Sequence, residues 1–250
     1  MKGSRLLVVA AVAVAAIGTP AAADPRAVVE LFTSQGCSSC PPADKLLGEL
    51  ARDPALVAMS LPIDYWDYIG WKDTLARPRH TARQRGYAKT RGDGEIYTPQ
   101  VVINGVARAV GSEKGEIERA IVQSRNNAAI LSVPVKVAAA DGKLTVSIAP
   151  QTEAKGNLLA SLDGAKGEVW LCALSKAVLV AIGRGENRGR TVTYHNVVRR
   201  WVKLGDWNGS ARTFSVPASD VDADTVAVIV QSGTVDHPGA MLGAALASVR

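Results

Sequence analysis

Two cysteines separated by two serines, Cys37 and Cys40, are the residues of this sequence that most clearly could do chemistry. They follow an apolar run over 27–32 that predicts a strand, and they precede leucines at helical spacing over 43–52. Two thiols this close can join in a disulfide, and a thiolate formed at one of them can attack a disulfide in another molecule. The pair therefore predicts thiol–disulfide chemistry at the start of a helix.

The place of the pair predicts which thiol reacts first. A helix N-terminus carries free backbone amides and partial positive charge. If Cys37 lies near the N-cap, the amides of Ser38, Ser39 and Cys40 can point at its sulfur and lower its pKa. We therefore predict that Cys37 attacks and that Cys40 resolves the mixed disulfide.

Two other interpretations of the cysteine pair stay open. It can be a permanently oxidised clip that holds a loop, or it can bind a soft metal such as copper(I). Zinc usually takes four ligands, the sequence has no second Cys-x-x-Cys, and the histidines at 80, 195 and 237 are scattered. We assign no metal site, and the dithiol chemistry requires no organic cofactor.

The first 23 residues have the pattern of a secretory signal peptide. Lys2 and Arg5 precede an apolar run over 6–17, and small residues over 21–23 suit cleavage. Twelve helical residues span about 18 Å, too short for a hydrocarbon core of about 30 Å. We expect a periplasmic or secreted protein that has no stable membrane span after cleavage.

The net charge and the third cysteine bear on the kind of partner and on the number of disulfides. The net charge is +6, and it falls to +4 without Lys2 and Arg5, which gives no argument for a nucleic-acid partner. An oxidising compartment lets disulfides persist. The three cysteines leave one unpaired within the monomer, and we interpret Cys172, which lies in an apolar segment, as a buried small hydrophobic residue.

The elements that must position the cysteines form an α/β pattern. Strands are expected at 27–32, 56–63, 101–103 and 106–110, and helices at 43–52, within 74–90 and at 112–124. Asn104 and Gly105 predict a hairpin turn, because both tolerate positive φ. Ser112 is the expected cap of the last helix. A strand–helix–strand unit followed by a hairpin predicts a mixed sheet with a helical insert.

After about residue 132, the sequence pattern changes from alternating strands and helices to short strands. Short strands are expected at 133–137, 144–148, 168–174, 177–182, 191–198, 211–216 and 225–231. Strands at this spacing are typical of a β-sandwich or barrel. We predict a domain over 24–128 and a sandwich-like β domain over 129–250.

Two further features could form a substrate groove. Thr98 and Pro99 come just before a predicted strand, where a cis proline would bring backbone near the sulfurs. Tyr65 and Trp66 begin an aromatic cluster after the second strand, whose carboxyl end should lie near the cysteines. The cluster can pack the helical insert onto the sheet, or it can form a wall that faces the substrate.

The motifs Cys-Ser-Ser-Cys-Pro-Pro at 37–42, Asp-Tyr-Trp-Asp at 64–67 and Tyr-Thr-Pro-Gln at 97–100 carry a family resemblance. Residues 27–125 resemble the thioredoxin superfamily. More closely, the chain resembles a family of secreted thioredoxin-like proteins catalogued as a domain of unknown function, and the resemblance continues through 185–187 and 195–197.

The resemblance implies a thioredoxin-like fold with a β domain after it. It implies Cys37 as the attacking thiol, Cys40 as the resolving thiol and Pro99 as a cis proline. Thioredoxins also keep a buried acid six positions before the first cysteine, but this sequence has Leu31 there. Glu30, one position earlier, is expected on the opposite side of the strand unless the turn is longer, so we assign it no proton relay.

These observations favour an exported thiol–disulfide oxidoreductase whose partner is a protein thiol, a protein disulfide or a redox protein. Fold analogy alone does not establish that function. A non-catalytic envelope binding module with a structural disulfide, and a copper-handling protein, are the alternatives.

Overall fold

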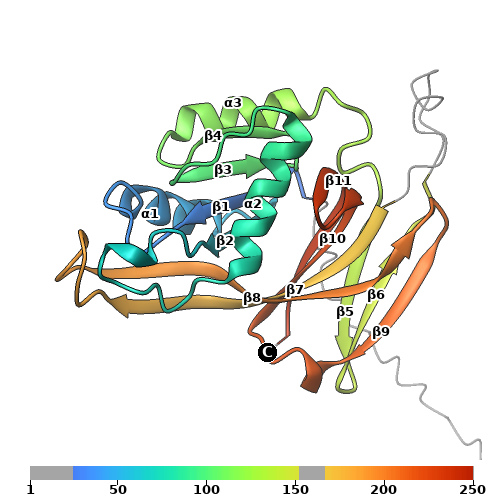
Figure 1. Ribbon diagram of the computed structural model, residues 1–250. Coiled ribbons are helices and arrows are strands. Elements are labelled where there is room, and N and C mark those ends of the chain that lie inside the picture. Colours follow the sequence, from blue (N-terminus) through green and yellow to red (C-terminus); the bar gives the residue numbers. More distant parts are fainter. Residues whose placement is uncertain (1–24, 152–166, 250) are drawn as a thin grey trace, which may run out of the picture.

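The computed structural model describes residues 25–151 and 167–249 of the chain. The predicted signal peptide, residues 1–23, lies outside the described residues. Within those two ranges, none of the helices has both the length and the hydropathy that crossing a membrane requires. In these ranges, two sheets and three α-helices make up the architecture in Figure 1.

The N-terminal half follows the predicted order of elements closely. Its strands are β1 (Ala27–Thr33), β2 (Leu56–Pro62), β3 (Gln100–Ile103) and β4 (Ala107–Val110). Its helices are α1 (Pro41–Leu50), the short η1 (Asp67–Ile69), α2 (Pro78–Arg91) and α3 (Lys114–Ser124).

The C-terminal half is built from strands, as predicted. They are β5 (Val135–Ala140), β6 (Lys143–Ile148), β7 (Gly167–Ala181), β8 (Thr191–Trp207), β9 (Arg212–Pro217), β10 (Thr225–Thr234) and β11 (His237–Ser248). A short helix, η3 (Ala218–Asp220), follows β9.

One mixed sheet joins the two halves. Its eight strands have the order β11-β10-β7-β8-β2-β1-β3-β4, in which β1 and β2 are parallel and β1 and β3 antiparallel. The junction is a parallel contact between β2 and β8, where Ser60 pairs with Val197. The predicted mixed α/β sheet is confirmed, and hydrogen bonding between strands continues past the predicted boundary at 128/129. The division into two domains stays a prediction.

The smaller sheet, β5-β6-β9, covers one face of the C-terminal strands. Its Val135, Leu144 and Val146 share a buried cluster with Leu171 of β7 and Val228 of β10. Two sheets that bury side chains between them form a sandwich-like layer.

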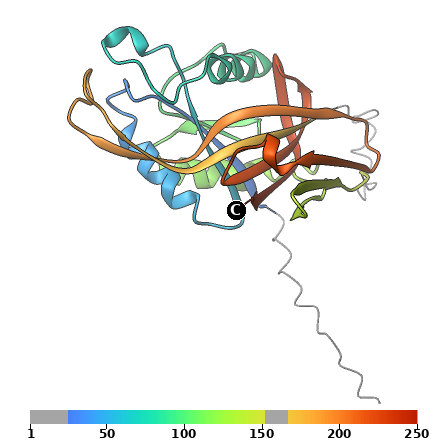
Figure 2. The same ribbon diagram turned by 90° about the horizontal axis from the view of Figure 1, so that it is seen from below.

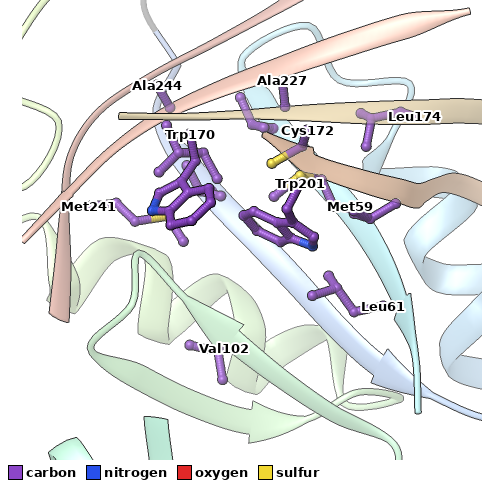
Figure 3. Close-up of a cluster of buried hydrophobic side chains, with 14 of the residues drawn as sticks. Met59, Leu61, Val102, Trp170, Cys172, Leu174, Trp201, Ala227, Met241 and Ala244 are labelled. Carbon is purple, nitrogen blue, oxygen red and sulfur yellow. The ribbon is translucent and has the colours of Figure 1, made fainter. Parts of the chain in front are cut away.

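The alternation of β1 separates two other cores. Ala27, Val29 and Leu31 pack against α1 and α3. Val28 and Phe32 face the opposite way, into a cluster with α2 and the C-terminal strands. Figure 3 shows that second cluster, in which Trp170 and Trp201 lie beside Cys172.

Local details confirm one sequence prediction and correct another. Asn104 and Gly105 have φ of 50° and 75°, as the predicted hairpin turn requires. Ser112 is not the cap of α3. Glu113 occupies that position and makes no side-chain capping hydrogen bond, so the helix begins two residues later than predicted.

The C-terminal strands differ from prediction in two places. The predicted strands 168–174 and 177–182 form the single strand β7, which continues past the sheet paired with β8 as a two-stranded arm. Figures 1 and 2 agree that the end of this arm lies beside α1. Strand β11 was not predicted, because its glycine and alanine residues have low strand propensity, and pairing with β10 holds it in place.

Candidate functional site

Cys37 and Cys40 form a disulfide in the loop between β1 and α1, with their Cα atoms 5.4 Å apart. The helix begins at Pro41, and Cys40 is the N-cap residue. Cys37 therefore lies three residues before the N-cap rather than at it. Prolines at the first two helical positions set the start of α1 there. The Cys40 amide donates to the Cys37 carbonyl oxygen, at 3.2 Å, and not to a sulfur.

The two sulfurs differ in access to solvent. Cys37 is 4% exposed and Cys40 is fully buried, whereas Ser38 and Ser39 between them are exposed. Cys37 is thus less exposed than its predicted role suggests, but it is the cysteine of the pair that reaches the surface. Its Sγ lies 3.5 Å from the hydroxyl of Ser39.

The loop before the disulfide is fixed by side chains from two distant segments. The backbone amide of Gln35 donates to Asp73 Oδ2 at 2.8 Å. The side-chain oxygen of Gln35 accepts from Trp71 Nε1 at 2.8 Å. Asn187, buried in the C-terminal half, donates through Nδ2 to the carbonyl oxygens of Gln35 and Cys37 at 2.9 and 2.8 Å. Sequence reasoning placed Asn187 in the family resemblance but gave it no role.

The predicted groove residues gather around this loop. The Thr98–Pro99 peptide bond is cis. A Cβ added to Gly111 would lie 2.9 Å from Pro99 Cβ and 3.1 Å from Ala43 Cβ, which places Pro99 beside the first turn of α1.

The aromatic cluster packs against the loop that carries the disulfide. Trp66 Nε1 donates to Thr98 Oγ1 at 2.8 Å, and a Cβ added to Gly36 would lie 3.1 Å from Trp66 Cβ. The rings of Tyr65 and Tyr68 lie 6.1 and 6.2 Å from that of Trp66, and Tyr68 is 78% exposed. The cluster therefore combines half-buried rings, Tyr65 and Trp66, with the exposed ring of Tyr68.

A buried carboxyl group that the sequence analysis did not single out lies one helical turn after Cys40. The Asp44 amide donates to the Cys40 carbonyl oxygen at 3.0 Å, and Asp44 Oδ1 accepts from Thr33 Oγ1 at 2.8 Å. Its Oδ2 is buried, with no hydrogen-bond partner among the described residues. Burial, with a smaller contribution from the charge of the nearby Asp73, raises the Asp44 pKa to about 8, although the hydrogen bond from Thr33 acts in the opposite direction. The four-residue spacing on one helix could have pointed to this neighbour of Cys40.

Asp73 and Tyr194 complete an acidic cluster beneath the loop. Burial raises the Asp73 pKa, although its carboxylate accepts from the amides of Gln35, Leu75 and Ala76. Burial also raises the pKa of Tyr194, and the charges of Asp44 and Asp73 act in the same direction. This cluster favours protonated carboxyl and phenol groups near the disulfide.

Glu30 faces away from α1, as expected from its position in the strand. It is fully buried and pairs with Arg83 of α2 at 2.7 Å. Tyr87 donates to Glu30, and Arg83 also donates to Gln231 of β10 at 2.8 Å. The group ties α2 to strands of both halves.

Cys172 is a buried residue of the core, as predicted, and burial raises the pKa of its thiol. In the described ranges, no group of three or more His, Cys, Asp and Glu side chains could hold a metal ion.

These features define a mixed α/β protein with a disulfide at the entrance to its first helix. The chain belongs to the family described as "Protein of unknown function (DUF1223)", whose model matches residues 28–231. No curated protein matches the sequence.

Two solved structures are similar. The crystal structure of an Agrobacterium tumefaciens protein is 29% identical with a TM-score of 0.78, and the match covers 91% of this chain and 96% of that one. HBP35 of Porphyromonas gingivalis is 12% identical with a TM-score of 0.57, and the match covers 90% of this chain and 76% of that one. The second likeness concerns the fold alone.

Proposed function

We propose that this protein is an exported thiol–disulfide oxidoreductase with a thioredoxin-like fold, and that Cys37 and Cys40 are its redox centre. The observation that carries the proposal is the disulfide at the entrance to α1, with Pro99 beside the first turn of that helix. Trp66 and Thr98, joined by a hydrogen bond, form the adjoining wall of the substrate groove.

The reaction proceeds in two exchanges. A client thiolate attacks Cys37 Sγ, a bond forms between client and Cys37, and the bond between Cys37 and Cys40 breaks with its electron pair on Cys40. A second client thiolate then attacks the client sulfur and releases Cys37 as a thiolate. The client becomes a disulfide and the protein a dithiol. The reverse sequence reduces a client disulfide.

Asp44 supplies the proton that this chemistry needs. Cys40 is fully buried, and a thiolate formed there would lack solvation. With a pKa of about 8, Asp44 is mostly protonated at neutral pH, one turn along the same helix. Its proton passes to the Cys40 sulfur as the disulfide opens and returns when Cys40 attacks.

The length of the closed loop favours a redox role over a structural clip. The disulfide spans a sequence separation of three, and in the chain-entropy model such a short loop contributes only about 2 kcal/mol. Hydrogen bonds from Asn187 and to Asp73 already hold the same loop. A permanent disulfide would therefore add little to an anchored segment.

Trapping of clients tests the proposal. Cys40→Ser removes the resolving thiol, so mixed disulfides should accumulate on Cys37 in extracts of the exported fraction and appear as mass shifts that a reductant removes. Cys37→Ser and Cys172→Ser are the matched controls, and neither should trap. A disulfide in the native protein that glutathione and dithiothreitol both leave intact would overturn the proposal.

Export is tested on the same material. The N-terminal sequence of the protein recovered from the periplasm or medium should begin near Asp24, after the predicted signal peptide. Recovery of the full-length chain from the cytoplasm alone would contradict it.

A further inference from the structure

A groove runs along the outer side of α1, away from the aromatic cluster. Its first part, about 520 Å³, lies between α1 and the strand β8, and Pro41, the residue after Cys40, lines it. A second hollow of about 530 Å³ shares Gly48, Arg52 and His195 with the first. The two form one channel that reaches Pro41 at the start of α1 and follows the helix.

The groove is lined by cations that lack ion-pair partners. Lys45 of α1, Arg52 just after that helix and Arg190 just before β8 are exposed, and none of them forms an ion pair with the described acidic residues. Glu49 is the acidic residue that lines the first part, and Asp224 and Lys176 line the second part. Unpaired cations along a groove attract an anionic ligand more strongly than the same charges spread over a surface.

The floor of the groove is a close contact between a helix and a strand. A Cβ on Gly48 would lie 2.5 Å from His195 Cδ2, so glycine lets β8 approach α1 at this point. Glycine inside a helix is less favourable than alanine, and the close approach offsets that cost. Burial and the charge of Arg52 lower the His195 pKa, so its ring is neutral at neutral pH and the three cations supply the charge.

We infer that this groove binds an acidic, extended segment of the client protein next to the client's reactive cysteine. The inference rests on the proposed function, because it gives the substrate class of the same redox centre. The occupant is a peptide because the groove is long and open and begins beside Cys40. Its charge is negative because Lys45, Arg52 and Arg190 form no ion pair with a described acidic residue, and cations outnumber carboxylates in the lining.

Peptide kinetics test the inference. Two synthetic peptides carry the same pair of thiols, one flanked by four aspartates and the other by four lysines. The wild-type protein should oxidise the aspartate peptide about tenfold faster at low ionic strength, and the difference should shrink at high salt. The triple variant Lys45→Glu, Arg52→Glu, Arg190→Glu should lose or reverse that preference.

A charge-matched control separates local from global effects. Arg125→Glu, Lys136→Glu and Lys143→Glu, which alter exposed residues outside the groove, should keep the preference. Equal rates for both peptides with the wild type would overturn the inference, and so would loss of the preference in the control. Dithiothreitol is uncharged at neutral pH and should react with all variants at similar rates, and glutathione is a second small reagent for the wild type. If the wild type fails to react even with these reagents, the proposed function itself fails.

Free phosphate serves as a competitor. An acidic peptide that occupies several cations should keep its advantage in millimolar phosphate at constant ionic strength. Complete loss of the advantage under that condition would show a small-anion site instead and overturn the peptide assignment.

Discussion

Asn187 donates a hydrogen bond of 2.8 Å to the carbonyl oxygen of Cys37, although 150 positions separate the two residues in the sequence. The same amide group donates to Gln35. The C-terminal half therefore takes part directly in fixing the disulfide loop. The loop conformation therefore depends on both halves, and the family model also spans both, over residues 28–231.

We predict that Asn187→Ala lowers the free energy of unfolding by about 2 kcal/mol, because it leaves the buried Gln35 and Cys37 carbonyl oxygens without that donor. Urea unfolding of the oxidised protein measures the change. Asn126→Ala, at an exposed position, is the control and should stay within about 0.5 kcal/mol of the wild type. Equal stability of the two variants would show that the Asn187 contacts contribute nothing.

A second prediction concerns the buried pair of Glu30 and Arg83. Arg83→Met should cost about 3–5 kcal/mol, because it leaves a buried carboxylate without its cation. The double variant Glu30→Leu, Arg83→Met should lose less than this single variant. Because Glu30 faces away from α1, the rate of reduction by dithiothreitol should not change in the double variant. A large drop in that rate would show that Glu30 takes part in the redox mechanism.

The sequence predicts the first half well because its signals are local. The alternation over 27–32, the leucines of α1 and the Asn104-Gly105 turn each specify an element by themselves. The same local reasoning finds Cys37, Cys40, Thr98 and Pro99, since each belongs to a short motif.

Long-range contacts explain what sequence reasoning missed. Strand β11 depends on its pairing with β10, and Asn187 reaches the loop only once β8 has joined β2. The start of α1 at Pro41 left Cys37 outside the helix by three residues. Asp44 could be recognised as a site residue only once its burial was known, because an exposed aspartate at the same helical position would have an ordinary pKa.

A third prediction addresses the aromatic wall. Trp66→Ala should slow oxidation of a peptide client about tenfold, through a higher KM, because it removes the ring that bonds Thr98 and stacks on Tyr68. The rate with dithiothreitol should stay the same. Trp66→Phe keeps a ring but not the hydrogen bond, so its rate with the peptide client should lie between those of the wild type and Trp66→Ala. Unchanged peptide kinetics in Trp66→Ala would assign the cluster to packing alone.

Two buried groups give the folded protein opposite responses to pH. Asp44 keeps its proton up to about pH 8, whereas an unfolded aspartate loses it near 3.8, so rising pH destabilises the fold through this window. Burial lowers the His80 pKa from 6.5 to about 4, so falling pH destabilises the fold between those values. The two effects oppose each other from about pH 4 to 6.5, and only that of Asp44 remains from 6.5 to 8.

The fourth prediction follows from that difference. Stability of the oxidised wild type should fall between pH 6.5 and 8 with a slope of up to about 1.4 kcal/mol per pH unit. Asp44→Asn should remove most of this slope, and Glu49→Gln, an exposed carboxyl of the same helix, should keep it. Urea unfolding at pH 5, 6.5 and 8 measures all three proteins. Asp73 shifts in the same direction as Asp44, so Asp73→Asn separates the two carboxyls. If Asp44→Asn retains the full slope while Asp73→Asn removes it, Asp73 and not Asp44 holds the proton beneath the disulfide.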